Sequence, residues 1–217
     1  MSSVLIVTGG TVDHVILERL YKEKCPDEVI AADRGLCACD TCGIMPDIVV
    51  GDFDSADDTM VKSYRGRTEF VDLDTHKDFT DTHKALAYAL EKGYAPIYLV
   101  GATGTRMDHT MANMGLLKQC ADRGTEAFII DGHCRIRMIS GDAVYKVAKD
   151  NEYPFISLIP YGGEAVVRSL KGFEYYGESI VFKPGDSLGV SNSIVKENGI
   201  IDLESCLLYT SDAADDT

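Results

Sequence analysis

The chain has 217 residues, of which 45% are hydrophobic and 26% charged, an ordinary composition for a globular protein of one large or two small domains. Its formal net charge of −14 at pH 7 argues against binding to nucleic acid or to anionic membranes, because both would repel an acidic surface. A small phosphate ligand is still compatible with this charge if Mg²⁺ carries positive charge into the site.

The apolar runs of the sequence are all much shorter than the roughly 20 residues that a membrane-spanning helix needs. The first residues, Met1–Val7, lack the basic segment and the long apolar stretch of a signal peptide. We therefore expect a cytoplasmic protein. Its seven cysteines, an odd number, should then be reduced.

Three of these cysteines, Cys37, Cys39 and Cys42, form a C-x-C-x-x-C run that resembles part of a zinc site. A closed zinc site needs four ligands, usually as two separated pairs, and the remaining cysteines are scattered singly along the chain. Small buried or half-buried thiols are therefore the favoured interpretation, with zinc as the alternative.

The first 130 residues alternate between short apolar runs and amphipathic segments. The apolar runs predict strands at 4–7, 29–32, 48–50, 69–72, 97–100 and 127–130, and the segments between them predict helices at about 15–24, 36–42, 80–92 and 108–123. The last helix should turn Met111, Met114, Leu116 and Leu117 inward. This alternation predicts a parallel sheet with helices on its faces.

After about Gly132 the helical periodicity nearly disappears. Short β-like runs follow at 135–139, 155–159, 165–167, 180–182 and 193–195, with turn signals that include Pro184-Gly185 and Asn198-Gly199. The predicted fold is thus α/β: an N-terminal Rossmann-like parallel sheet with flanking helices, followed by a smaller C-terminal all-β sandwich domain. The expected domains are 1–132 and 133–206, and the polar, acidic segment 207–217 is expected to be a disordered tail.

Polar clusters follow the first, second, third and fifth of these strands. They are Thr8-Gly9-Gly10, Asp33-Arg34-Gly35, Gly51–Ser55 and Gly101–Gly104. The carboxyl ends of parallel strands meet at one edge of a sheet, where ligands bind. Turn formation explains any one cluster, but it explains poorly why so many acids gather at the same end.

The motif Asp52-Phe53-Asp54 places two carboxylates on the same side of an extended segment. Two converging carboxylates repel unless a cation lies between them, and oxygen ligands suit Mg²⁺. Asp74, Asp78 and Asp81 form a second acidic cluster. Its alternative role is capping of the helix that begins there, with Asp78 or Thr80 as the N-cap residue.

The third candidate cluster is Gly101–His109, whose glycines allow close approach of the backbone to a ligand. Arg106 can make a two-pronged contact to phosphate, or it can form a surface pair with Asp108. Asn113 lies in the following helix, where its alternative is a buried amide bonded to the backbone. The P-loop and G-x-G-x-x-G patterns are absent, so acids with a metal, together with Arg106, would have to hold a nucleotide.

Five motifs occur in order and together resemble the thiamine pyrophosphokinase family of the bacterial type. They are Ala32–Gly35, Gly51–Ser55, Lys77–Asp81, Gly101–His109 with Asn113, and Ser191-Asn192. The resemblance covers about residues 4 to 204. It implies transfer of a pyrophosphoryl group from ATP to thiamine, in a homodimer with active sites at the subunit interface.

The resemblance also implies a role for individual residues. Catalysis and Mg²⁺ binding would fall to Asp52, Asp54 and Asp81. Nucleotide binding would fall to Asp33, Arg34, Gly51, Thr103 and Arg106, and substrate binding to Lys77, Asp108, Asn113, Ser191 and Asn192. Two departures stand out: Thr105 replaces a common glycine, and the segment after Ser205 does not continue like the family.

Two other functions are compatible with these residues. One is a related diphosphokinase that acts on a hydroxymethyl-pterin, and the other is a catalytically silent protein that binds nucleotide or thiamine. Ser191-Asn192 and the C-terminal β domain favour thiamine. The three aspartates favour catalysis, because binding alone does not need a metal triad.

Overall fold

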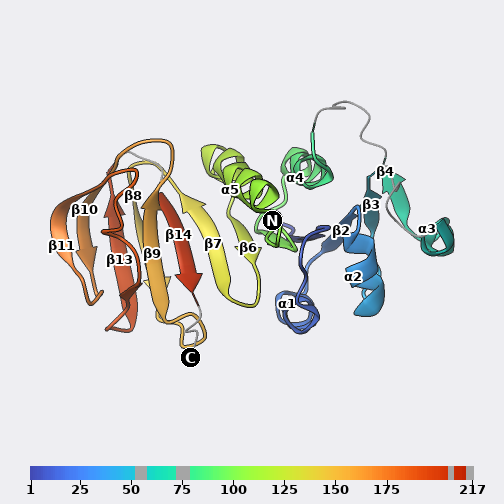
Figure 1. Ribbon diagram of the computed structural model, residues 1–217, viewed down its shortest axis with the longest axis horizontal. Coiled ribbons are helices and arrows are strands. Elements are labelled where there is room, and N and C mark those ends of the chain that lie inside the picture. Colours follow the sequence, from blue (N-terminus) through green and yellow to red (C-terminus); the bar gives the residue numbers. More distant parts are fainter. Residues whose placement is uncertain (52–57, 72–78, 205–207, 214–217) are drawn as a thin grey trace. The chain divides into compact units, whose positions relative to one another are not determined.

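The computed structural model describes residues 1–51, 58–71, 79–204 and 208–213, and the chain divides into two compact units (Figure 1). Unit 1 is Met1–Asp131 and unit 2 is Gly132–Thr217. No helix in these described ranges is long and apolar enough to cross a membrane.

Unit 1 is built on a parallel sheet with the strand order β4-β3-β2-β1-β5-β6. The strands are β1 (Val4–Val7), β2 (Glu28–Ala32), β3 (Ile48–Val50), β4 (Glu69–Val71), β5 (Ile97–Val100) and β6 (Ala127–Ile130). Strands β1 to β3 and β5 are almost completely buried, as expected for a sheet that is covered on both faces. The predicted parallel sheet is confirmed.

The helices of unit 1 are α1 (His14–Lys24), α2 (Gly35–Thr41), α3 (Asp58–Tyr64), α4 (Asp81–Lys92) and α5 (Met107–Asp122). Asp13 caps α1 by accepting from the backbone N–H groups of Val15 and Ile16, and Thr80 caps α4 in the same way from His83. Of the two predicted N-cap residues, Asp78 and Thr80, the structure thus has Thr80 in this role. Helix α3 was not expected from the sequence.

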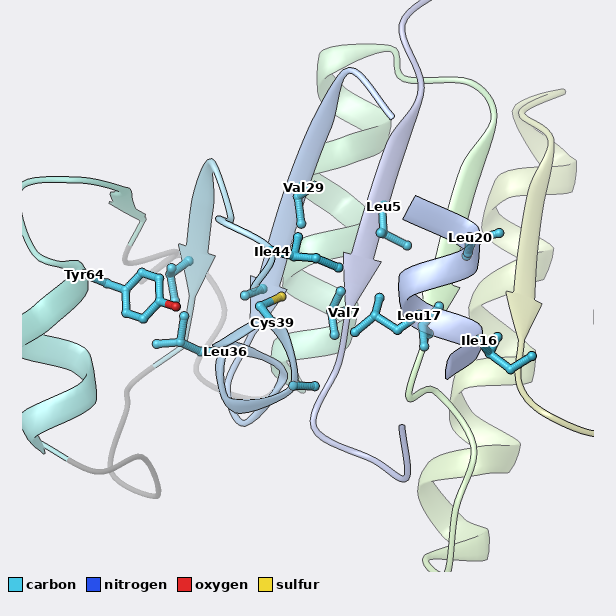
Figure 2. Packing of buried hydrophobic residues seen from close by; sticks show 14 of the residues in the cluster. Leu5, Val7, Ile16, Leu17, Leu20, Val29, Leu36, Cys39, Ile44 and Tyr64 are labelled. Atoms are coloured by element: carbon cyan, nitrogen blue, oxygen red, sulfur yellow. The ribbon is translucent and has the colours of Figure 1, made fainter. Parts of the chain in front are cut away.

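The helices lie on the two faces of the sheet, with α1 and α2 on one and α4 and α5 on the other (Figure 1). Figure 2 shows how Leu5 and Val7 of β1 pack between Leu17 of α1 and the α2 residues Leu36 and Cys39. On α4 the predicted apolar face is confirmed, since Ala85, Leu86, Ala89 and Leu90 are all buried.

The inward face of α5 differs from its prediction. Leu116 and Leu117 are buried, but Met111 is 65% exposed and Thr110 and Asn113 are buried instead. Placing Met111 inward was wrong because the N-terminal turns of α5 border a polar cavity rather than the apolar core. The polar side chains of Thr110 and Asn113 at these inner positions therefore line the cavity.

Unit 2 contains two antiparallel sheets, with the strand orders β12-β9-β14-β7 and β11-β10-β13-β8. The strands are β7 (Cys134–Ile139), β8 (Ala143–Ala148), β9 (Phe155–Pro160), β10 (Ala165–Lys171), β11 (Gly177–Phe182), β12 (Asn192–Ser193), β13 (Asn198–Leu203) and β14 (Leu208–Ala213). One apolar cluster joins side chains of both sheets, among them Ile156, Leu158, Val167 and Leu203. The expected sandwich is confirmed.

Three strands of unit 2 depart from the expectation. Asn198-Gly199 was predicted to make a turn but begins β13. The glycine is present for close packing and not for a turn, since a Cβ on Gly199 would come within 2.4 Å of the Phe173 ring. Strand β8 was also missed. Instead of a disordered tail, Leu208–Ala213 forms β14, which pairs with β7 on one side and β9 on the other. Such pairing depends on tertiary context and not on local composition.

Candidate active site

A cavity of about 830 Å³ lies in unit 1 at the carboxyl ends of the parallel strands; we call it the site cavity. Its walls come from the loops after β1, β2 and β5 and from the first turns of α4 and α5. Strand β1 lies between β2 and β5, so the sheet reverses its order beside β1, which is where ligands bind in open α/β sheets. The predicted site residues that line it are Asp33, Arg34, Asp81, Thr103, Arg106 and Asn113.

The loops after β1 and β5 interlock and form the floor of the site cavity. The backbone N–H groups of Gly10 and Thr11 donate to the carbonyls of Gly101 and Thr103, each at 3.0 Å. A Cβ on Gly10 would come within 2.1 Å of the Gly101 oxygen, so only glycine allows this approach. Thr8-Gly9-Gly10 was predicted to lie at the ligand-binding edge of the sheet, but without an individual role, because its contacts depend on the pairing of two distant strands.

Asp33 directly follows β2 and has a left-handed backbone conformation, with φ of 49°. Its N–H donates to the Val50 carbonyl at 2.9 Å, and its own carbonyl accepts from Leu36 at 3.2 Å. A non-glycine residue rarely adopts this conformation, and such residues gather at functional sites. The conformation places Asp33 and Arg34 on the wall of the site cavity.

Asp81 is the first residue of α4, and its half-buried carboxylate accepts from Lys84 Nζ at 3.3 Å. Gly51 lies beside it: a Cβ on Gly51 would be 3.7 Å from the carboxyl carbon of Asp81 and 3.4 Å from the Cα of Asp33. The chain therefore enters the Asp52-Phe53-Asp54 motif between these two acids. Asp52, Asp54 and Lys77 themselves lie outside the described residues.

These acids fit a hard divalent cation by their chemistry. Carboxylates close to a helix N-terminus and to a backbone that approaches through glycine provide the oxygen donors that Mg²⁺ prefers. Within the described ranges, no group of three histidine, cysteine or acidic side chains could hold a metal ion. A complete ligand set would therefore need the aspartates of the motif after Gly51.

Arg106 and Asp108 form an exposed pair at the start of α5. The Nε of Arg106 donates to Oδ1 of Asp108 at 3.2 Å, and a second guanidinium nitrogen donates to Oδ2. This contact holds the pKa of Asp108 down at about 2. Arg106 lines the site cavity, so the surface pair that the sequence offered as an alternative is present at its rim.

Asn113 and Thr103 support the loop after β5. The buried Asn113 donates from Nδ2 to the Ala102 carbonyl at 2.7 Å, as the alternative interpretation expected. Thr103 donates from its hydroxyl to Oδ2 of Asp131 at 2.8 Å. Both side chains thus fix the loop that carries them to the site cavity.

The cysteine run of α2 and its C-cap forms no group that could hold a metal ion with the other residues that the structure describes. Cys39 is buried in the core cluster, and burial raises its pKa to about 12. Cys37 lines the site cavity, whereas the Cys42 thiol points to the carbonyl of His14 at 3.7 Å.

Ser191 and Asn192 lie in unit 2. Ser191 has a left-handed backbone with φ of 57°, and its N–H donates to the Ser157 hydroxyl at 3.1 Å. Asn192 is buried, and its amide bonds to backbone groups of Tyr175 and Ser193. Hydrogen bonds within unit 2 therefore hold both residues in place.

Comparison with known proteins follows the division into two units. Residues 19–129 match "Thiamin pyrophosphokinase, catalytic domain", and residues 144–208 match "Thiamin pyrophosphokinase, vitamin B1 binding domain". The chain belongs to the thiamin pyrophosphokinase family. It is 31% identical over 175 residues to the thiamine pyrophosphokinase of Bacillus subtilis (strain 168), covering 78% of this chain and 79% of that relative.

Two crystal structures of this family are similar over nearly the whole chain. The thiamine pyrophosphokinase from Bacillus subtilis is 27% identical with a TM-score of 0.86, over 98% of this chain and 99% of that chain. The thiamin pyrophosphokinase from Geobacillus thermodenitrificans is 29% identical with a TM-score of 0.85, over 99% of this chain and 98% of that chain.

Proposed function

We propose that the chain is a thiamine diphosphokinase, which transfers the pyrophosphoryl group of ATP to thiamine with Mg²⁺ as cofactor and gives thiamine diphosphate and AMP. The observation that carries this proposal is the site cavity. It lies within the matched catalytic domain and gathers Asp33, Arg34, Asp81 and Arg106 at one edge of the parallel sheet. Its volume of about 830 Å³ suits a nucleotide-sized ligand.

The transfer forms one bond and breaks one bond. The hydroxyl oxygen of thiamine attacks the β-phosphorus of ATP, and the bond from this phosphorus to the oxygen that bridges to the α-phosphorus breaks. AMP leaves with that oxygen, and the hydroxyl proton is released. Transfers of this kind depend mainly on positioning and on neutralisation of phosphate charge, so no side-chain nucleophile is required.

Asp81, together with Asp52 and Asp54, would hold Mg²⁺. When bound, the ion would neutralise the charge on the transferred phosphates. Support for this set comes from Gly51, which brings the chain beside the Asp81 carboxylate immediately before Asp52. Asp81 lies in the first turn of α4, where the helix dipole favours a negative charge.

Arg34 and Arg106 would bind the phosphate oxygens. Arg34 directly precedes α2, and its exposed side chain lines the site cavity. Arg106 presents a planar fork whose present partner, the Asp108 carboxylate, has the same two-oxygen geometry as a phosphate edge. Asp33, Gly51 and Thr103 would complete the nucleotide side.

Thiamine would be held by Lys77, Asp108 and Asn113 together with Ser191-Asn192 of the vitamin B1 binding domain. The resemblance to the family supports a homodimer in the cytoplasm, with each active site at the subunit interface. The acidic character of the chain, with a net charge of −14, also favours the cationic thiazolium ring of thiamine as a ligand.

A coupled assay for AMP release tests this function. With ATP and Mg²⁺, AMP should appear only when thiamine is added, and a hydroxymethyl-pterin should give none. AMP release with the hydroxymethyl-pterin instead of thiamine would show that the chain is one of the related diphosphokinases. Binding of ATP or thiamine without any AMP release would identify a silent binding protein.

A further inference from the structure

One hydroxyl group on the wall of the site cavity is both buried and unpaired. Thr8 directly follows β1, lines the cavity and is 1% exposed. Its Oγ1 has no hydrogen-bond partner among the residues that the structure describes. The hydroxyls of Thr103 and Thr110, which line the same cavity, donate to the Asp131 carboxylate and to the Arg106 carbonyl. A buried hydroxyl without a partner costs free energy, so its presence at this position needs an explanation.

Packing alone does not explain the Thr8 hydroxyl. Valine has the same branched shape, suits the end of a strand equally well and would bring no polar atom into this position. The backbone of Thr8 does not depend on its side chain, because its N–H donates to the Val100 carbonyl at 2.8 Å. Its carbonyl packs against Gly101, where a Cβ would come within 2.6 Å of the Thr8 oxygen. The hydroxyl therefore stands on a fixed backbone and is available to a ligand.

The side chain of Thr8 belongs to the same face of the sheet as Asp81. Leu5 and Val7 of β1 pack into the core cluster that includes α1 and α2. Successive side chains of a strand alternate between the faces, so Thr8 lies on the opposite face, which α4 and α5 cover (Figure 1). Asp81, in the first turn of α4, also lines the site cavity. The hydroxyl is thus on the side of the sheet that carries the proposed metal ligand.

The position of Thr8 favours a phosphate group as its ligand. In open α/β sheets the turn after the first strand meets phosphate groups, which usually bind to N–H groups at the start of the next helix. Here the Asp13 carboxylate accepts from the N–H groups of Val15 and Ile16 in α1, so these donors are occupied. A hydroxyl that donates to an anionic oxygen makes a strong hydrogen bond. Thr8 offers such a donor where the helix does not.

We propose that Thr8 is a nucleotide-binding residue, whose buried hydroxyl donates to an oxygen of the triphosphate chain of ATP. This inference rests on the proposed function. A β-branched side chain on a fixed backbone has few rotamers, so the donor loses little conformational freedom when the nucleotide binds. The phosphate oxygen would give the hydroxyl the partner that the described part of the chain does not provide.

Calorimetric titration of substituted chains with ATP and Mg²⁺ tests this assignment. Thr8→Val removes only the hydroxyl, so the Kd for ATP should rise about tenfold, the effect of one hydrogen bond to a charged group. The Tm of the chain without nucleotide should stay the same or rise, because an unpaired buried hydroxyl is lost. Thr8→Ser keeps the donor, and its Kd should stay close to that of the unchanged chain.

Thr68→Val is the matched control. The Thr68 hydroxyl donates to the Pro46 carbonyl at 3.0 Å, and Thr68 precedes β4, at the opposite edge of the sheet from the site cavity. The same substitution should therefore lower the Tm there and leave the Kd for ATP unchanged. An equal rise of the Kd in Thr68→Val and Thr8→Val would contradict a local contact at Thr8.

Inorganic tripolyphosphate, which has no nucleoside, identifies the part of ATP that Thr8 contacts. In competition with ATP, it should bind to Thr8→Val more weakly than to the unchanged chain by the same factor as ATP does. Equal binding of tripolyphosphate to both chains would overturn the phosphate contact, as would an unchanged Kd for ATP in Thr8→Val. A Thr8→Val chain that is less stable or does not fold would show a structural hydroxyl and overturn it too. Failure of the proposed function looks different, since the unchanged chain would then bind ATP but release no AMP with thiamine.

Discussion

At the scale of single residues, the proposed phosphate role of Arg106 depends on its pairing with Asp108 at the rim of the site cavity. The guanidinium of Arg106 uses two N–H groups on the Asp108 carboxylate, and both side chains are largely exposed. An exposed pair of this kind contributes little to stability. In the proposed function, Arg106 would therefore exchange the Asp108 carboxylate for phosphate oxygens with little loss of stability.

Substitution of Arg106 should reduce catalysis and leave the fold intact. Arg106→Lys keeps the charge but loses the two-pronged geometry, so kcat/KM for ATP should fall clearly, and Arg106→Ala should fall further. The loss of charged hydrogen bonds to phosphate should lower kcat/KM roughly ten- to a hundredfold. Lys118→Ala, which removes an exposed pair with Asp122 at the other end of α5, is the control. If kcat/KM for ATP changed less than twofold in both variants, Arg106 would be only a surface charge.

The Asp108 carboxyl group should report this pairing in a pH titration. Its pKa of about 2 lies below the ordinary value of 3.8 because the Arg106 guanidinium bonds to the charged form. The pair therefore contributes at pH values above 3.8, and its contribution is lost as the pH falls through 2. Carbon-detected NMR should find the low pKa in the unchanged chain and a return toward 3.8 in Arg106→Ala. The same low pKa in both proteins would contradict this assignment.

Removal of the Asp81 charge should abolish most of the turnover. Asp81→Asn keeps the size of the side chain at the start of α4 but removes the charge of a proposed metal ligand. We expect kcat to fall about a hundredfold or more with a nearly unchanged melting curve. Asp122→Asn, at the exposed end of α5, is the matched control. An active Asp81→Asn enzyme with normal stability would remove Asp81 from the metal set.

At the scale of elements, the packing of α2 on β1 fixes the wall that carries Asp33 and Arg34. The helix begins at Gly35, where a Cβ would come within 2.0 Å of the Val7 carbonyl oxygen. The glycine of the Asp33-Arg34-Gly35 motif is thus required for close packing of helix and strand. The motif is visible in the sequence, but the need for glycine follows from the contact between α2 and β1.

Gly35→Ala should therefore destabilise unit 1. The added methyl group must push α2 away from β1, and such overpacking typically costs about 1–3 kcal/mol. Gly163→Ala is the control, because a Cβ there meets nothing within 4 Å and the backbone is not left-handed. Chemical denaturation of both variants measures the difference. Equal stability of the two would show that α2 tolerates the displacement.

Much of the element order could be predicted from the sequence, and the exceptions have physical reasons. Buried strands such as β1 and β5 are uninterrupted apolar runs, and the apolar face of α4 has helical spacing. Helix α3 was missed because few of its described side chains pack on the core, namely Val61, Tyr64 and the partly buried Met60, and so short a set gives no visible period. Strand β14 was missed because its order comes from neighbours on both sides.

The site, too, could be predicted from the sequence only in part. The acids at the strand ends could be located from the sequence, since the carboxyl ends of parallel strands share one edge. The role of the Thr8–Val12 loop could not, because it follows from hydrogen bonds to the distant Gly101–Thr103 loop. Nor could the sequence show that the amide of Asn192 is bonded to the backbone of Tyr175.

At the scale of the whole molecule, the two units match two different domains of the family. Unit 1 contains the site cavity and matches the catalytic domain of the family. Unit 2 is an antiparallel sandwich and matches the vitamin B1 binding domain. The proposed reaction would take its nucleotide-binding residues from unit 1 and its thiamine-binding residues from both units.

The fate of the β-phosphate of ATP tests the central claim most directly. With ATP labelled at the β-phosphorus, Mg²⁺ and thiamine, the label should appear in thiamine diphosphate, and unlabelled AMP should form in equal amount. This result requires attack at the β-phosphorus, with the bond to the α-bridging oxygen broken. Labelled ADP together with thiamine monophosphate would show transfer of a single phosphoryl group and would contradict the account.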